Sequence, residues 1–368
     1  MIVSIQYRLA ALGFLSSTEI KKEGTANAGL LDQRSALEWV KRNIAAFGGD
    51  PTQVTIIGGS AGGGSVMNQL IMYGGVENPP FRAGIAEYPW WQPFHDDKTL
   101  ETQYKDFLAS SGCSDLECLR AAPIDKLVDA TNATFFSGYQ AKLYGFGDFY
   151  LGPSVDGEII RDLPSNEWKQ DHFSKVPLLV DRDQYEGVIF TNPTLATTDE
   201  LTADLQAVFP LAQPSFFSRL YDYYPESAYN STFFRREAIF GDFIINCPTY
   251  YMATAASDLE IPTWKLVFNA GSQLHGATSP FLFAPESANN QTLSLILQDY
   301  FLSFVVDLDP NTVSYSGAAK PFWPQYQASA EFPVLSINYT EVGAVSDKYY
   351  DATSKCDFFH AESYVVRN

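Results

Sequence analysis

The hydrophobic pattern changes character several times within the first 73 residues. Residues 2–7 are mostly apolar without alternation, which is typical of a strand buried on both faces. In residues 27–47, NAGLLDQRSALEWVKRNIAAF, apolar side chains recur mostly three or four positions apart and predict an amphipathic helix that the following GGDP ends. Residues 54–57 predict a second strand, and residues 61–73 are compatible with a second helix. This order of strand, helix, strand, sharp turn and helix indicates a parallel sheet with crossover helices.

Later segments extend this sheet. Residues 95–175 are rich in aromatic residues and turn formers and predict a cap or insertion over the sheet. We find no internal repeat, low-complexity tract or long linker, so we expect residues 1–368 to form a single α/β domain. Further strands are predicted at residues 83–88, 176–181, 264–268 and 334–337.

The composition is that of a globular protein and argues against membrane-spanning and nucleic-acid-binding proteins. Hydrophobic residues make up 46% of the chain and charged residues 18%, as in soluble globular proteins, and no run of 18 apolar residues predicts a membrane-spanning helix. The net charge of -19, with no cluster of Lys and Arg, argues against a nucleic-acid partner. The opening residues MIVSIQYRL lack the basic segment and cleavage site of a signal peptide.

Cysteines and glycosylation sequons indicate an oxidising route through the cell. The cysteines are even in number, and Asn-x-Ser/Thr sequons accompany them. Chance sequons and plain core cysteines are the alternative. The cysteines are Cys113, Cys118, Cys247 and Cys356, and the sequons begin at Asn132, Asn230, Asn290 and Asn338.

A glycine-rich corner, GGSAGGGS, carries the main candidate chemistry. A Walker-type phosphate loop requires a lysine before the hydroxyl residue, and none occurs between residues 51 and 77. The glycines also miss the dinucleotide register G-x-G-x-x-G. Ser60 fits a nucleophile elbow instead, on a strained strand-to-helix turn where side chains at Gly58 and Gly62 would collide.

A serine nucleophile requires a base within hydrogen-bonding reach. His95 and His172 lie in polar stretches that contain aspartate, and His360 is close to the C-terminus, so we expect these three to be solvated or capping residues. His275 follows a predicted strand in a glycine-flanked loop, where a doubly wound fold places its chemistry. His275 is therefore the candidate base.

The base in turn requires a carboxylate that orients its ring. In this fold class the acid is expected between the serine and the histidine along the chain, after a strand. The segment VPLLVDRDQYEG offers Asp181, Asp183 and Glu186, and position alone does not choose among them.

Several segments together resemble the type B carboxylesterase/lipase family, which includes fungal secreted lipases and the cholinesterases. They are QYRLAALGFLS, the helix with GGDP, GGSAGGGS, GPSVDGEII, VPLLVDRDQYEGVIF, INCPTYY and LHGATSPFLF. The resemblance implies an α/β-hydrolase fold, a mostly parallel doubly wound sheet with helical cap insertions. It implies a carboxylic ester hydrolase acting through an acyl-enzyme on a small-molecule or lipid ester, without metal or cofactor.

The resemblance also implies roles for single residues. The family's acid precedes the glycine of a D-x-x-E-G block, which implies Glu186, and its H-G-x-E block implies His275, so the triad is Ser60, Glu186 and His275. The same comparison pairs the cysteines as Cys113 with Cys118 and Cys247 with Cys356. These bridges imply a secreted, extracellular parent protein.

Three departures from the family pattern carry expectations of their own. Gly59 stands where the family usually has glutamate, which removes a carboxylate expected near the histidine, and Thr278 ends the H-G-x-E block. The family's His-Gly-Gly-Gly oxyanion segment should precede QYRL, so we expect residues 1–368 to lack the N-terminal strands and to leave a sheet edge uncovered. Of the oxyanion hole only the N–H of Ala61 can be named. An impaired fragment and a non-catalytic cholinesterase-like binding module are therefore the alternatives.

Aromatic residues near these motifs suggest an apolar acyl site. Trp90, Trp91 and Phe94 follow a predicted strand, and Phe281 and Phe283 follow the candidate base. The alternative is that these five rings simply belong to the core.

Overall fold

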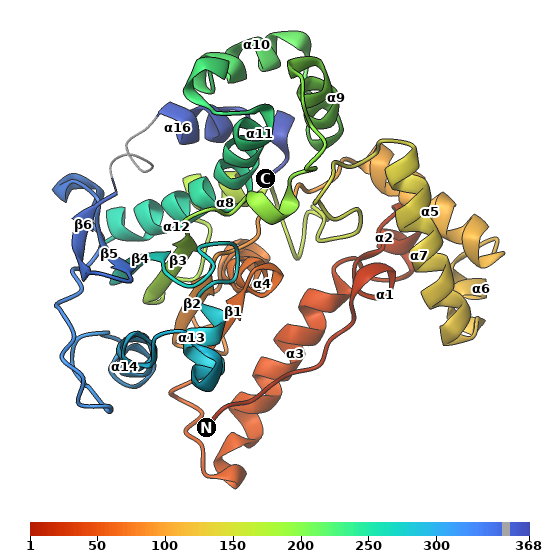
Figure 1. The fold of residues 1–368 in the computed structure, drawn as a ribbon. Helices are drawn as coiled ribbons and strands as arrows, with labels where there is room; N and C mark the ends of the chain where they lie inside the picture. The colour runs from red at the N-terminus through yellow and green to blue at the C-terminus, as the bar shows by residue number, and fades with distance from the viewer. Residues whose placement is uncertain (348–353) are drawn as a thin grey trace.

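A six-stranded sheet forms the centre of the computed structural model, which describes residues 1–347 and 354–368 (Figure 1). The strands are β1 Thr55–Gly59, β2 Ala83–Glu87, β3 Leu178–Asp183, β4 Thr263–Asn269, β5 Pro333–Asn338 and β6 Val342–Ser346, in that spatial order. β1 to β5 are parallel, with Ile57 opposite Ile85, and β6 runs antiparallel to β5. The prediction of a mostly parallel sheet is confirmed, and β6 is an addition to it.

Helices cover both faces of the sheet. Neighbouring strand residues point to opposite faces, and the apolar ones on each face pack against helices. Ala86 and Val180 pack into the core on one face, whereas Ile85 and Leu179 pack into the core on the other. Figure 1 shows α4, α8 and α12 on one side of the strands and α13 and α14 on the other. The bounds are α3 Ala28–Asn43, α4 Ala61–Ile71, α8 Pro164–Lys169, α12 Cys247–Asp258, α13 Ser279–Phe283 and α14 Gln291–Asp307.

Two helical groups flank the carboxyl ends of the strands (Figure 1). The first shares a small core that includes Leu15, Phe107 and Ala130, and consists of α1 Ala10–Phe14, α2 Thr18–Glu23, α5 Asp97–Ser111, α6 Leu116–Ala121 and α7 Ile124–Gln140. The second comprises α9 Thr198–Val208, α10 Pro214–Tyr223, α11 Thr232–Gly241, α16 Ser354–Ala361 and α17 Ser363–Val366. The cap predicted within residues 95–175 thus accounts for part of the first group only.

Short helical turns complete the chain. They are η1 Ile44–Phe47, η2 Met72–Gly74, η3 Val188–Phe190, η4 Glu226–Ala228, η6 Pro285–Ser287 and η7 Ala328–Ala330, with a π-helical turn η5 at Asp242–Asn246. Of these, η3 begins two residues after Glu186, one of the three candidate acids. Among the described residues no helix is both long enough and apolar enough to cross a bilayer.

The prediction of a strand at residues 2–7 is wrong. This segment is extended and largely exposed, and it pairs with none of the strands that the structure describes. A strand is defined by a ladder with a neighbour, and local apolar character cannot supply one. The segment is instead fastened to α3, because the backbone N–H of Arg8 donates to Asp32 at 3.0 Å and the Arg8 guanidinium donates to both Asp32 oxygens at 2.7 Å. β1 is accordingly the first of the strands that the structure describes.

Two disulfides link distant and local segments. Cys113 bonds to Cys118 at the start of α6, and Cys247 in α12 bonds to Cys356 in α16. Both cysteines of the second bridge are fully buried. The second bridge therefore joins a helix packed on the sheet to the C-terminal helices.

Candidate active site

Ser60 alone makes the turn between β1 and α4. Its backbone has φ +58° and ψ -122°, a conformation that strains any residue with a side chain. The Ser60 N–H donates to the carbonyl of Glu87 at 3.1 Å. Its own carbonyl accepts from the N–H groups of Gly64 and Trp90, at 2.9 and 3.0 Å. These hydrogen bonds to β2 and the segment after it hold Ser60 in its strained conformation.

The glycines around Ser60 differ in how much space a side chain would have at each position. A Cβ on Gly58 would lie 2.4 Å from the backbone of Gly62, so strand and helix approach too closely there for a side chain. A Cβ on Gly62 would meet nothing within 4 Å, so the expected collision at Gly62 is wrong. The tight approach on the helix lies one residue later, since a Cβ on Gly63 would lie 2.5 Å from the carbonyl oxygen of Glu87.

The structure brings the three candidate triad residues into one hydrogen-bonded chain. Nε2 of His275 lies 2.7 Å from Oγ of Ser60, and Nδ1 of His275 lies 2.6 Å from Oε2 of Glu186. The three residues follow β1, β4 and β3, so they meet at the carboxyl edge of the parallel sheet. The His275 and Glu186 side chains are 7% and 0% exposed, which removes competing water from their contact. The arrangement can transfer a proton from the serine hydroxyl to an oriented imidazole.

The three carboxylates that the sequence offered as the triad acid have different hydrogen-bond partners. Glu186 accepts from its own segment as well as from the ring, since its Oε1 lies 2.5 Å from the N–H of Asp183. The Asp183 carboxyl accepts the N–H groups of Gly276 and Ala277, at 2.6 and 3.0 Å, and so fixes the loop after His275. Asp181 accepts the backbone N–H of Tyr88 at 2.8 Å. Only Glu186 contacts the imidazole.

Further carboxyl groups lie buried behind the histidine. Burial raises the pKa of Asp181 and Asp183 well above the ordinary aspartate range, and neighbouring carboxylates add to the shift. Burial likewise raises the pKa of Glu87 to about 7, against a hydrogen bond from Thr278 that lowers it. The Thr278 hydroxyl donates to Glu87 at 3.1 Å. Gly59 supplies no carboxylate of its own, but the carboxyl groups of Asp183 and Glu87 contact the histidine loop at Gly276 and Thr278.

The remaining histidines lie away from the triad. His172 is partly exposed, with Nδ1 3.8 Å from a Glu167 oxygen, as expected for a solvated residue. His95 is buried, so the expectation of a solvated or capping residue is wrong for His95. His360 is partly exposed in the last turn of α16 and stacks on Tyr251 with ring centroids 4.0 Å apart. Burial lowers the pKa of His95 and of His360 to about 4, which leaves both neutral at pH 7.

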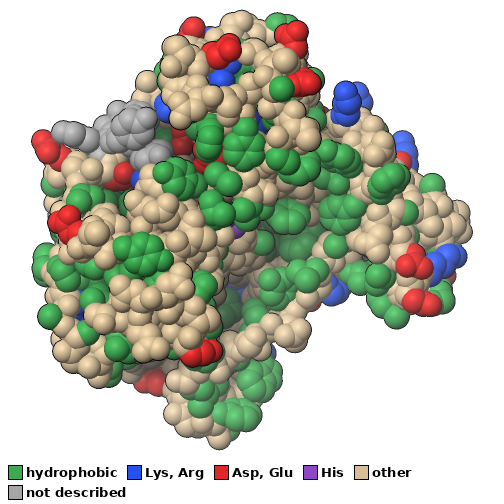
Figure 2. Space-filling model, viewed as in Figure 1, with side chains coloured by type: hydrophobic (Ala, Val, Ile, Leu, Met, Phe, Trp, Pro, Cys, Tyr) green, Lys and Arg blue, Asp and Glu red, His purple; other side chains and the backbone are tan. Residues whose placement is uncertain are grey.

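An aromatic wall surrounds the imidazole. The rings of Trp90 and Phe190 meet it edge-on, with centroids 6.0 and 5.0 Å from the His275 ring. Trp90 also contacts Phe149 and Phe240, at 5.4 and 5.7 Å. In the space-filling view, hydrophobic side chains gather around a central hollow of the molecule (Figure 2). The candidate site therefore has an apolar surround suited to hydrocarbon groups.

Of the five aromatic residues predicted to line a pocket, only Trp90 contacts the imidazole. Trp91, Phe94 and Phe281 are buried in the core, and Phe283 is 63% exposed. No sequence pattern pointed to Phe149, Phe190 and Phe240, because they come from segments far apart along the chain. Tyr88 also contacts the His275 ring, and its position directly after β2 is a signal that could have identified it.

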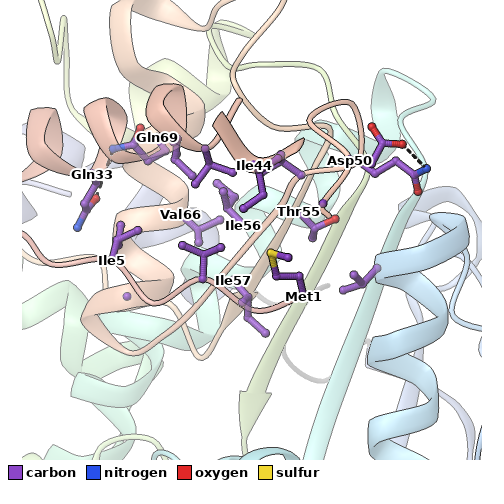
Figure 3. Close-up of a pocket in the computed structure, with 18 of the residues that line it drawn as sticks. Met1, Ile5, Gln33, Ile44, Asp50, Thr55, Ile56, Ile57, Val66 and Gln69 are labelled. Carbon is purple, nitrogen blue, oxygen red and sulfur yellow. Dashed lines mark hydrogen bonds between the residues drawn. The ribbon is translucent and has the colours of Figure 1, made fainter. Parts of the chain in front are cut away.

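The start of α4, directly after Ser60, is open. Ala61 is exposed, and its N–H is among the first of α4, which have no partner within a helix. Along the outer edge of β1 runs a groove with a cavity of about 480 Å³, lined by the 1–7 segment, α3, β1 and α4 (Figure 3). Gly62 lines this groove, so it begins next to Ala61 and extends away from the triad.

The sequons occupy different surroundings. Asn132 and Asn230 are exposed, whereas Asn290 caps α14 by accepting the N–H of Leu293 and Asn338 accepts N–H groups of its own turn. Within residues 1–347 and 354–368, no group of three His, Cys, Asp or Glu side chains is arranged to hold a metal ion.

Comparisons with known proteins identify the family to which the chain belongs. Residues 1–359 match the sequence model of the carboxylesterase family. The chain is 31% identical to the secreted triacylglycerol lipase LIP1 of Gibberella zeae, over 91% of this chain and 62% of the lipase, and 33% identical to Lipase 2 of Geotrichum candidum, over 95% and 66%. It therefore spans less than two thirds of the length of these relatives. The crystal structure of Aspergillus niger EstA superposes with a TM-score of 0.87 at 27% identity, covering 98% of this chain and 74% of EstA. The fold is that of the α/β-hydrolases, and the chain belongs to the carboxylesterase family.

Proposed function

We propose that this chain hydrolyses carboxylic esters through an acyl-enzyme formed on Ser60. The observation that carries the proposal is the continuous contact from Ser60 Oγ through the imidazole of His275 to Glu186, with distances of 2.7 and 2.6 Å. A serine hydroxyl becomes a nucleophile when an adjacent base takes its proton, and a carboxylate on the far nitrogen selects the required tautomer.

The reaction has two halves. Ser60 Oγ attacks the acyl carbon while His275 Nε2 takes the hydroxyl proton, and the imidazolium formed is stabilised by Glu186. The C–O bond to the alcohol then breaks, and His275 returns the proton to the departing oxygen. In the second half water attacks the acyl-serine in the same way, which releases the carboxylic acid and regenerates Ser60. The N–H of Ala61 donates to the oxyanion in both tetrahedral intermediates.

The substrate is an ester with an apolar acyl group. Trp90, Phe149, Phe190 and Phe240 support this assignment, because they form a continuous aromatic surface that begins at the imidazole. The site uses no cofactor in this scheme.

We also propose a secreted glycoprotein as its natural form. Two disulfides support an oxidising compartment, and the name of the LIP1 relative describes that lipase as secreted. The exposed Asn132 and Asn230 are the favoured glycan sites. A mass decrease after enzymatic removal of N-glycans from protein made in a eukaryotic host is expected; an unchanged mass would contradict the assignment.

A fluorophosphonate probe tests the nucleophile. We expect covalent labelling at Ser60 and hydrolysis of p-nitrophenyl esters, both abolished in Ser60→Ala, with a loss of about 10⁴-fold or more in kcat. Ser65→Ala is the matched control, because Ser65 lies one turn further along α4 and its hydroxyl accepts from Gln33 instead. Equal labelling of Ser60→Ala and wild type would disprove the assignment. A well-folded protein that is neither labelled nor active, but binds hydrophobic esters, would favour the binding-module alternative.

A further inference from the structure

Tyr88 occupies the space that a side chain at position 59 would need. A Cβ built on Gly59 would lie 2.4 Å from the hydroxyl oxygen of Tyr88 and 2.6 Å from its Cζ. Real Cβ atoms are not found at such distances, so a residue larger than glycine before the nucleophile would have to displace the ring. Tyr88 and Gly59 are therefore a matched pair across β1 and β2.

Several contacts hold Tyr88 in this position. Its backbone N–H donates both to the carbonyl and to the carboxyl of Asp181, at 3.0 and 2.8 Å. Its hydroxyl lies 2.7 Å from the hydroxyl of Ser279. Its φ of +32° is unusual for a residue with a side chain, and its side chain is buried. Because backbone and hydroxyl are both fastened, the ring has little freedom to move.

The tyrosine contacts the His275 segment at two points. Its ring meets the imidazole edge-on, with centroids 4.9 Å apart and planes at 77°. Ser279, its hydroxyl partner, is the first residue of α13, four residues after His275. The contact with the ring and the hydrogen bond to α13 thus constrain both the imidazole and the chain that follows it.

We propose that Tyr88 is a positioning residue that keeps the imidazole of His275 directed at Ser60. Glycine at position 59 leaves the space that the Tyr88 ring occupies. This inference rests on the proposed ester hydrolysis. The hydroxyl of Tyr88 pairs with Ser279 and its ring packs on the imidazole, so Tyr88 acts through His275. Its effect is geometric, since a misplacement of about 1 Å at a catalytic group lowers a rate by about 10²-fold. Trp90 and Phe190 also contact the imidazole, so Tyr88 is one of several aromatic rings that pack against it.

The first test removes the tyrosine. We expect Tyr88→Ala to lower kcat about 30- to 100-fold with KM within about threefold, because the oriented imidazole is used in the transition state more than in substrate binding. The matched control is Tyr300→Ala. Tyr300 is also fully buried, meets Trp323 edge-on and donates its hydroxyl to Pro321, but it lies in α14 away from the triad. An equal fall in kcat for both variants, or an unchanged kcat in Tyr88→Ala, would overturn the proposal.

The second test uses the shared space. Gly59→Ala in the wild type is expected to lower kcat by about 10²-fold, because its Cβ displaces the Tyr88 ring. In the Tyr88→Ala background the same substitution is expected to change kcat by less than about threefold, because the space is vacant. Equal losses in the two backgrounds would show that Gly59 is required for another reason and would overturn the pairing.

A structural readout separates this inference from the proposed function. If the wild type hydrolyses no ester, the proposed function fails, but the positioning of His275 remains measurable. Crystal structures of wild type and Tyr88→Ala should then differ in the distance between His275 Nε2 and Ser60 Oγ, which is 2.7 Å with the tyrosine present. An unchanged distance and ring orientation in the variant would overturn the positioning role.

Discussion

Two regions that meet at Ser60 differ in what forms them: buried side chains in one, and exposed backbone in the other. On the side of His275 and Glu186, nearly buried side chains are linked by short hydrogen bonds and enclosed by aromatic rings. On the side of Ala61, the candidate donor is a backbone N–H at the exposed start of α4, next to an open groove. This difference means that catalysis depends on the identity of the side chains in the first region and on the position of the backbone N–H in the second. Substitutions should therefore affect the two sides in different ways.

The largest expected effect comes from the buried side. Glu186→Gln should lower kcat about 10⁴-fold, because the amide no longer stabilises the imidazolium or selects its tautomer. Asp183→Asn is the matched variant three residues earlier. Burial raises the pKa of Asp183, and an asparagine oxygen at this position can still accept the N–H groups of Gly276 and Ala277.

We therefore expect Asp183→Asn to retain kcat within about tenfold in steady-state ester hydrolysis. A larger loss in Asp183→Asn than in Glu186→Gln would reverse the assignment of the triad acid. That result would also erase the distinction between the acid that contacts the ring and the acid that holds its loop.

The open side gives a smaller effect that depends on the backbone alone. Ala61→Pro removes the N–H at the first position of α4, where proline fits a helix, and should lower kcat about 10²- to 10³-fold. Ala61→Gly keeps the N–H and should stay within a few-fold of wild type. Circular dichroism verifies that both variants are folded. Full activity in Ala61→Pro would mean that this N–H does not stabilise the oxyanion.

The smallest effect is on stability and its dependence on pH. The buried Glu87 has a pKa raised to about 7, so folding favours its protonated form, and the associated stability is lost as pH rises from about 4.5 through 7. Glu87→Gln keeps an acceptor for Thr278 without the charge. Its gain in unfolding free energy over wild type should be about 2 kcal/mol larger at pH 8 than at pH 5.

Denaturant unfolding at the two pH values measures this difference. Glu77→Gln, at an exposed position, is the control and should show no such pH-dependent gain. If Glu87→Gln is no more stabilising at pH 8 than at pH 5, Glu87 is already ionised in the folded protein at pH 5. The buried side would then be more polar than its contacts indicate.

Much of the sheet could be predicted from local pattern, and the exceptions have a common cause. β1, α3 and α4 form where periodicity and the glycine corner place them, because their signals lie within each element. The apolar 2–7 segment carries the same local signal as β1 but has no ladder. β6 has mostly exposed residues and a weak apolar pattern, and it forms because β5 offers an antiparallel edge. Pairing is a property of two segments, so a single segment cannot reveal it.

The site divides in the same way. The sequence alone determined that Ser60 sits on a strained elbow, because the collision that requires Gly58 arises between atoms four residues apart. Position along the chain left three acids open and the family resemblance named Glu186, whereas the contact of Glu186 with His275 is seen in the tertiary structure. The tertiary structure alone decided that Tyr88 fills the space beside Gly59 and that His95 is buried. Those outcomes depend on contacts between residues 29 to 215 positions apart, such as Gly59 with Tyr88 and Ser60 with His275. Local sequence patterns carry no record of such distant neighbours, since the packing of the whole sheet brings them together.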